Sequence, residues 1–157
     1  AVEQGIANPE QLGVGGWSYG GILTNYVITK TDRFKGAISG ASETLYRSNY
    51  GHDHYQLHWE LELGLPWETP QKWERISPFN DVANVTTPTL WIGGSDDWNV
   101  PILGSEQMYQ AMKRLGVETQ LVVYPGEHHG IRRPAFQKDR YERYLQWFDH
   151  YVKNSVN

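Results

Sequence analysis

The sequence predicts an α/β fold in which a parallel sheet is covered by helices on both faces. Four short apolar segments are expected to form strands, and longer segments with helical spacing separate or follow them. Short apolar runs of this kind are typical of strands buried on both faces, which occur mainly in parallel sheets. The carboxyl ends of such strands share one edge, so we expect the functional loops there. The predicted strands are 12–16, 36–39, 88–93 and 121–124.

Three helices are predicted from apolar residues at helical spacing. The first follows the first strand up to about Lys30, the second runs from Pro101 to a stop at Gly116, and the third covers 136–152. Residues 1–7 are expected to form the tail of another helix, and 40–87 has a looser pattern that resembles an insertion. The expected apolar stripes are Ile22, Leu23, Tyr26 and Val27; Met108, Met112 and Leu115; and Tyr141, Tyr144, Leu145, Phe148 and Val152.

Composition narrows the possible functions. The chain has 157 residues, enough for one domain with a hydrophobic core. Its 14 basic and 18 acidic residues give a formal charge of −4 with no basic run, which argues against nucleic acid or an anionic membrane surface as the main partner. The absence of cysteine excludes disulfides and thiol catalysis. No apolar run approaches the ~18 residues that a membrane span needs.

The segment 16–20, Gly-Trp-Ser-Tyr-Gly, fits the G-x-S-x-G pattern of a nucleophile elbow. Such an elbow holds a serine on a sharp turn between a strand and a helix, in strained backbone geometry. Side chains at Gly16 and Gly20 would be expected to collide with neighbouring segments. Because a predicted strand precedes the motif and a predicted helix follows it, Ser18 is a candidate nucleophile.

A serine nucleophile needs a base, and the base needs an acid that orients it. Candidates for both follow directly after predicted strands. The segment after the third strand offers Asp96 or Asp97, and the segment after the fourth offers His128 or His129. The order Ser, Asp, His along the chain is that of the α/β-hydrolases.

These segments resemble the catalytic domain of the prolyl oligopeptidase family of serine peptidases, with its acylaminoacyl-peptidase and dipeptidyl-peptidase branches nearest. The matching motifs are G-W-S-Y-G-G at 16–21, G-x-x-D-x-x-V-P at 94–101, and a tyrosine-proline run ending in H-G at 124–130. The resemblance extends over essentially the whole chain. It implies the C-terminal part of an α/β-hydrolase fold, with a parallel sheet of about four strands.

The resemblance also implies the roles of individual residues. It favours Asp97 over Asp96 as the acid and His129 over His128 as the base, with Ser18 as nucleophile. The backbone N–H of Tyr19 would then donate to the oxyanion. The reaction implied is acyl transfer on a peptide or acyl-peptide substrate, and the family needs no metal or cofactor.

The resemblance places a substrate pocket beside the nucleophile. Asn99 and Val100 are expected to line it, and Tyr46 and Tyr50 are candidates for its aromatic walls, although packing within the insertion would also account for the tyrosines.

In this family a second oxyanion donor, the first strands of the sheet and a β-propeller lie upstream of the elbow. We therefore expect 1–157 to form a single, incomplete catalytic domain. Two alternatives follow. The same triad could serve an esterase, or the chain could be a catalytically incomplete fragment that forms a homo-oligomer through an exposed sheet edge.

The histidine-rich segment 52–62 is an alternative candidate for a metal site. His54, His58 and Glu62 are spaced so that a helix would align them on one face. The same spacing suits an ordinary polar helix face with Leu57 and Leu61 packed inward. Since no H-E-x-x-H motif is present, we favour the polar face and predict no metal.

Overall fold

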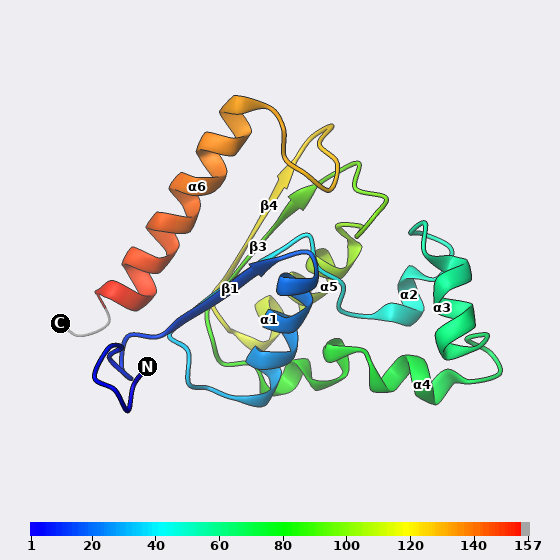
Figure 1. Ribbon diagram of the computed structural model, residues 1–157, viewed down its shortest axis with the longest axis horizontal. Helices are drawn as coiled ribbons and strands as arrows, with labels where there is room; N and C mark the ends of the chain where they lie inside the picture. The colour runs from blue at the N-terminus through cyan, green and yellow to red at the C-terminus, as the bar shows by residue number, and fades with distance from the viewer. Residues whose placement is uncertain (155–157) are drawn as a thin grey trace.

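The structure, a computed structural model, describes residues 1–154. Its centre is a sheet of four parallel strands in the order β1-β2-β3-β4 (Figure 1). This sheet confirms the predicted α/β fold. The strands are β1 (Gly13–Trp17), β2 (Gly36–Gly40), β3 (Thr89–Gly94) and β4 (Thr119–Tyr124).

Helices cover both faces of the sheet, as predicted. One face carries α1 (Tyr19–Lys30), packed on β1 and β2, and α5 (Leu103–Leu115), packed on β3 and β4. The helix α6 (Pro134–Phe148) crosses the opposite face and continues into a π-helical turn, η2 (Asp149–Lys153) (Figure 1). No helix within residues 1–154 is long and apolar enough to cross a membrane.

The central strands are buried because the helices cover them on both sides. Every residue of β2 and β3 is buried, whereas β1 and β4 are partly exposed. Trp91 of β3 is completely buried, and its indole N–H donates to Thr119 Oγ1 of β4 at 3.0 Å. Burial of an aromatic side chain with its polar atom satisfied contributes strongly to stability. The core on this face consists of Ile28, Ala37, Val85, Trp91, Met108 and Met112.

On the other face, glycines let α6 approach the sheet. A Cβ atom at Gly13 would lie 2.8 Å from the Phe148 ring, and one at Gly36 would lie 3.0 Å from Tyr151 Cβ. The predicted stripe of α6 is therefore only partly right. Phe148 faces the sheet, but Tyr141 and Leu145 are 57% and 67% exposed.

Residues between β2 and β3 form an insertion with its own small core. Its buried residues are Tyr46, Leu63 and Trp73, which pack together at one end of the molecule (Figure 1). The expectation that Leu57 and Leu61 pack inward is wrong, because they are 69% and 79% exposed on the outer side of α3. The insertion comprises α2 (Tyr46–Asn49), α3 (Gln56–Leu63), α4 (Pro70–Arg75) and the 3₁₀ helix η1 (Pro78–Asn84).

The prediction of a helix at residues 1–7 is wrong. This segment forms turns, in which the Gly5 N–H donates to the Val2 carbonyl and Gly5 has a φ of 70°. Only glycine adopts such a φ without steric cost, so Gly5 interrupts the helical pattern.

The strand β1 lies at an edge of the sheet. Within residues 1–154 it pairs with β2 on one side only. An unpaired strand edge offers free backbone N–H and C=O groups to another strand. Self-association through this edge stays a prediction.

We expect Gly116→Ala to lower the free energy of unfolding by about 1 kcal/mol, because an L-residue is strained in the left-handed region. Gly116 ends α5 with a φ of 75°, and nothing lies within 4 Å of a Cβ atom built there. Gly130 also has open space but no left-handed φ, so Gly130→Ala is the matched control and should change stability by less than about 0.5 kcal/mol. Urea unfolding measures both. Equal losses for the two variants would contradict the conformational explanation.

Candidate active site

The carboxyl ends of three strands bring Ser18, Asp97 and His129 into one hydrogen-bonded chain. Ser18 follows β1, Asp97 follows β3, and His129 lies in the loop after β4. His129 Nε2 lies 2.8 Å from Ser18 Oγ, and His129 Nδ1 lies 2.9 Å from Asp97 Oδ2. The side chain of Asp97 is 1% exposed and that of His129 is 26% exposed. The arrangement places a buried carboxylate behind an accessible imidazole and hydroxyl.

Ser18 has the strained backbone expected of an elbow. Its φ of 60° lies in the left-handed region, and its N–H donates to the Gly40 carbonyl of β2 at 2.9 Å. A non-glycine residue in a sparsely populated region costs roughly 1–3 kcal/mol and persists only where its surroundings enforce it. The turn directs the Ser18 side chain toward His129.

Only one of the two flanking glycines is required for steric reasons. A Cβ atom at Gly16 would lie 2.3 Å from the Gly20 carbonyl carbon, which is backbone and cannot yield easily. At Gly20 nothing lies within 4 Å of such an atom. The expected collision is therefore confirmed for Gly16 and wrong for Gly20.

The two aspartates after β3 have different environments. Asp97 Oδ1 accepts hydrogen bonds from the backbone N–H groups of Asn99 and Val100, at 2.9 and 2.8 Å. A carboxylate can only accept hydrogen bonds, so Asp97 Oδ2 must receive the hydrogen of His129 Nδ1. The other ring nitrogen, Nε2, then carries no hydrogen and can accept the hydroxyl hydrogen of Ser18. Asp96 instead accepts from Ser95 Oγ and takes no part in this chain.

The two histidines after β4 also separate clearly. His128 is exposed, and its Nδ1 lies 2.7 Å from the Asp96 carbonyl oxygen. The backbone carbonyl of His129 accepts from the Trp17 indole N–H at 3.0 Å, which ties its loop to the end of β1. The structure thus joins His129, rather than His128, to Ser18.

A close backbone approach sets the position of the histidine loop. A Cβ atom at Gly94 would lie 2.1 Å from the Glu127 carbonyl oxygen, so only glycine fits at the end of β3. The Glu127 side chain is 4% exposed, accepts from the Arg132 backbone N–H, and lies 3.3 Å from Arg133 Nε. This buried carboxylate fastens the loop that carries His129.

A cavity of about 170 Å³ opens beside Ser18. The structure places Asn99, Val100 and Tyr46 in its lining, together with Ser18 itself. Tyr50 is not among the lining residues; its hydroxyl donates to Glu60 Oε1 at 2.7 Å and its ring packs edge-on against Trp67 and Trp73. The other lining residues were not assigned to this pocket from the sequence, although Tyr19 was expected as the oxyanion donor and His58 was a candidate metal ligand. They are Tyr19, Ile22, Glu43, Asp53, Tyr55, His58 and Trp59.

Glu43 is the most unusual group in this lining, because its carboxyl is buried. The residue is 3% exposed; Oε1 accepts from the backbone N–H groups of Thr44 and Leu45, and Oε2 accepts from the Asn49 side-chain amide. Burial raises the pKa of Glu43 from 4.5 to about 7, while the two backbone N–H groups act in the opposite direction. The negative charge of Asp53 adds to the increase in pKa.

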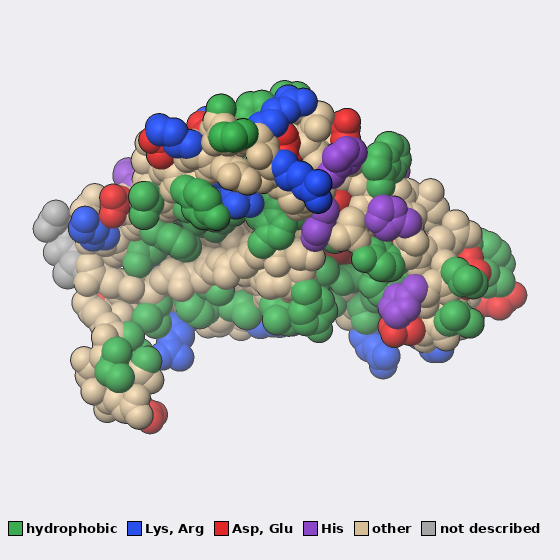
Figure 2. All heavy atoms as spheres, turned by 45° about the horizontal axis from the view of Figure 1, so that its top comes forward, with side chains coloured by type: hydrophobic (Ala, Val, Ile, Leu, Met, Phe, Trp, Pro, Cys, Tyr) green, Lys and Arg blue, Asp and Glu red, His purple; other side chains and the backbone are tan. Residues whose placement is uncertain are grey.

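The candidate metal cluster does not assemble. No group of three or more His, Cys, Asp or Glu residues within 1–154 is arranged to hold a metal ion. His54 lies before the start of α3, and His58 Nε2 lies 3.4 Å from Glu62 Oε1. Histidine side chains gather on the part of the surface over the strand ends and the insertion (Figure 2).

A model of the prolyl oligopeptidase family matches residues 1–155. The chain is 36% identical to a Bacillus subtilis protein named uncharacterized peptidase YuxL, over 92% of this chain and 23% of that protein. It is 30% identical to the acylamino-acid-releasing enzyme of Arabidopsis thaliana, over 98% of this chain and 21% of that enzyme.

A solved structure shows the same arrangement of the backbone. The uncomplexed acylaminoacyl peptidase of Pyrococcus horikoshii superposes with a TM-score of 0.88 at 28% identity, covering 97% of this chain and 27% of that one. The chain therefore spans about a quarter of the length of the proteins it matches.

We expect Gly16→Ala to lower the free energy of unfolding by at least about 2 kcal/mol, because the new methyl group would press on the backbone of Gly20. Gly20→Ala is the matched control, since its methyl group would enter open space in the first turn of α1 and should leave stability equal or slightly higher. Thermal and urea unfolding measure both variants. If Gly16→Ala were as stable as the wild type, the backbone of the elbow would have to move to make room for the methyl group, which would contradict this explanation.

Glu43→Gln should raise stability above neutral pH. The pKa of Glu43 is about 7 in the folded protein, against 4.5 for the ordinary carboxyl of the unfolded chain. Between these two pH values the unfolded chain loses the proton more readily than the folded protein, so the free energy of unfolding falls as the pH rises from 4.5 to 7. The glutamine oxygen can still accept from the backbone N–H groups of Thr44 and Leu45. If the Asn49 side-chain amide rotates by half a turn, its otherwise unpartnered Oδ1 can accept from the new glutamine NH₂ group. We expect the variant to gain on the order of 1–3 kcal/mol at pH 8 and little at pH 4, measured by urea unfolding. A gain that is independent of pH would contradict the raised pKa.

Proposed function

Because the chain belongs to the prolyl oligopeptidase family, we propose that it carries the catalytic site of a serine hydrolase that cleaves peptide or acyl-peptide bonds. The single observation that supports this most is the hydrogen-bonded chain from Asp97 through His129 to Ser18. These residue types in this geometry are the working parts of acyl transfer through a covalent intermediate.

In the proposed reaction, Ser18 Oγ attacks the substrate carbonyl carbon and His129 Nε2 takes its proton. The imidazolium that forms is stabilised by Asp97, which also holds the ring in the tautomer that accepts at Nε2. His129 then gives the proton to the departing amine, and the acyl group remains on Ser18 as an ester. Water attacks this ester while the same imidazole takes its proton, and the imidazolium returns that proton to Ser18 Oγ as the acid is released.

The negative oxygen that develops during attack needs hydrogen-bond donors. Tyr19 begins α1 directly after Ser18, and the first N–H groups of a helix have no partner within it. We assign the Tyr19 N–H as one oxyanion donor. The positive end of the α1 dipole acts in the same direction.

The acyl side of the substrate would enter the cavity beside Ser18. Asn99 and Val100 line it from the loop after β3, and their N–H groups are those that hold Asp97. Tyr46 supplies an aromatic wall from the insertion. One segment thus both orients the acid and shapes the proposed pocket.

A fluorophosphonate probe tests the proposal, because it phosphonylates activated serines. We expect one adduct, on Ser18, located by mass spectrometry of the digested protein. Ser18→Ala should abolish it. Ser48→Ala removes an exposed hydroxyl that does not line the cavity and should leave labelling unchanged. An intact, folded protein that resists the probe, or an adduct that survives Ser18→Ala, would count against a catalytic Ser18.

A further inference from the structure

We propose that the cavity beside Ser18 selects substrates that present an ammonium group, through the carboxylates of Glu43 and Asp53. This inference rests on the proposed function and names the substrate class of the same site. The ammonium group can come from a lysine side chain or from the α-amino group of a peptide.

The cavity lining carries negative charge. Two carboxyl side chains, Glu43 and Asp53, line it, and no Lys or Arg of residues 1–154 does. Neither carboxyl forms an ion pair with a cation within residues 1–154. His58 is the only ionisable nitrogen in the described lining, and it already faces Glu62. Buried charges are normally paired, so the cavity offers negative charge without its counterion.

The two carboxyl groups accept hydrogen bonds only from neutral donors. The groups that hold Glu43 are all neutral amides: two backbone N–H groups and the Asn49 side chain. Asp53 likewise meets only neutral donors, the Tyr55 backbone N–H at Oδ1 and the Trp59 indole N–H at Oδ2. Since each carboxylate oxygen can accept about two hydrogen bonds, Glu43 Oε2 and both Asp53 oxygens have acceptor capacity in surplus. An ammonium group brings three donors and a positive charge, which is the complement of this surplus.

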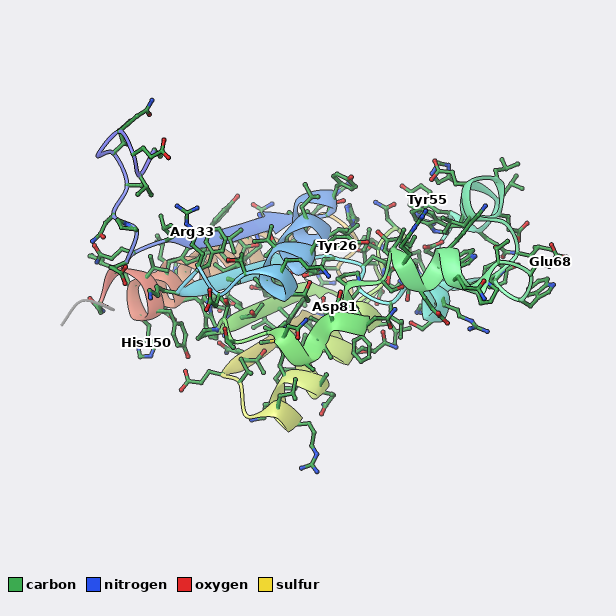
Figure 3. The ribbon with its side chains drawn as sticks, turned by 90° about the horizontal axis from the view of Figure 1, so that it is seen from below. Tyr26, Arg33, Tyr55, Glu68, Asp81 and His150 are labelled. Atoms are coloured by element: carbon green, nitrogen blue, oxygen red, sulfur yellow. The ribbon has the colours of Figure 1, made fainter. Side chains whose placement is uncertain are left out.

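The walls of the cavity are largely aromatic and apolar. Tyr46, Tyr55 and Trp59 line it together with the two carboxyl groups, and Ile22 adds an apolar side chain to the same lining. Tyr55 lies in the insertion, directly before α3, on the side of that helix nearer to α1 (Figure 3). Aromatic faces attract cations, and apolar walls accept the methylene stem of a lysine. An acidic substrate side chain would meet repulsion from two carboxylates.

A purely structural role does not account for all of these features. Fastening the 43–49 segment needs hydrogen-bond acceptors, which an uncharged amide would supply without the cost of a buried charge. The raised pKa of Glu43 reflects that cost, which burial and Asp53 both increase. A bound cation would offset the cost of the buried Glu43 charge, because an opposite charge nearby favours the ionised carboxylate.

The experiment uses diphenyl phosphonate inhibitors, which react with Ser18 and mimic the residue before the scissile bond. One pair is N-acylated and carries either a lysine or a norleucine side chain, which differ by the ammonium group. A second pair has norleucine with the α-amino group free or acylated. Rates of Ser18 modification are measured by mass spectrometry on wild-type protein, Glu43→Gln, and Glu106→Gln. The last variant removes one exposed negative charge on α5, away from the cavity.

We expect the ammonium form to react at least about 10-fold faster in one pair for the wild type, and the affected pair identifies the source of the cation. Glu43→Gln should reduce this ratio about 10-fold, and Glu106→Gln should not change it. If Glu43→Gln fails to fold, Asp53→Asn makes the same comparison.

A small fluorophosphonate without a side chain serves as the reference. If it fails to label Ser18, the proposed function fails. If it labels Ser18 but both pairs give ratios near or below one, or the ratio survives in the folded carboxylate variants, the inference about the cavity is overturned.

Discussion

Two hydrogen bonds, from Ser18 to His129 and from His129 to Asp97, tie together the ends of β1, β3 and β4. The parallel sheet makes this possible because it delivers all three loops to the same edge, with β2 holding β1 and β3 in register. Two close contacts then bring the loop that carries His129 up to the ends of β1 and β3. Gly94 lets the histidine loop lie against the end of β3, and the Trp17 indole holds that loop from β1.

The same edge concentrates conformations and charges that do not favour folding. Ser18 lies at a positive φ, and Glu43 and Asp97 bury their carboxyl groups. The free energy that these features cost is offset by the hydrophobic core between the sheet and its helices, in which Trp91 is fully buried. Such a concentration of strain and buried charge is expected where a protein holds reactive groups in a fixed geometry. Asp97 and Glu43 differ in one respect: Asp97 faces an imidazole within the chain, whereas Glu43 faces only neutral donors.

Much of the fold follows from the sequence because short apolar strands and glycine-flanked turns are local signals. Ser18 and the pairs Asp96 or Asp97 and His128 or His129 are predicted as catalytic candidates for the same reason, and the choice within each pair depends on a family resemblance. The sequence does not assign Glu43 and Asp53 to the cavity, because segment 40–87 has no periodic pattern that shows which side chains face it. The helical spacing of apolar residues does not predict that Leu145 of α6 is exposed while Phe148 contacts the sheet. Which residues of α6 are buried depends on where this helix crosses the strands.

The central claim is that Asp97 and His129 act on Ser18 as one unit, and a double-mutant cycle on the rate of Ser18 phosphonylation tests it most directly. Residues that act together show strongly non-additive losses. We predict that Asp97→Ala and His129→Ala each slow the reaction by at least about 10²-fold, and that the double variant is no slower than the slower single variant. Losses that multiply in the double variant, with all proteins folded, would contradict the account.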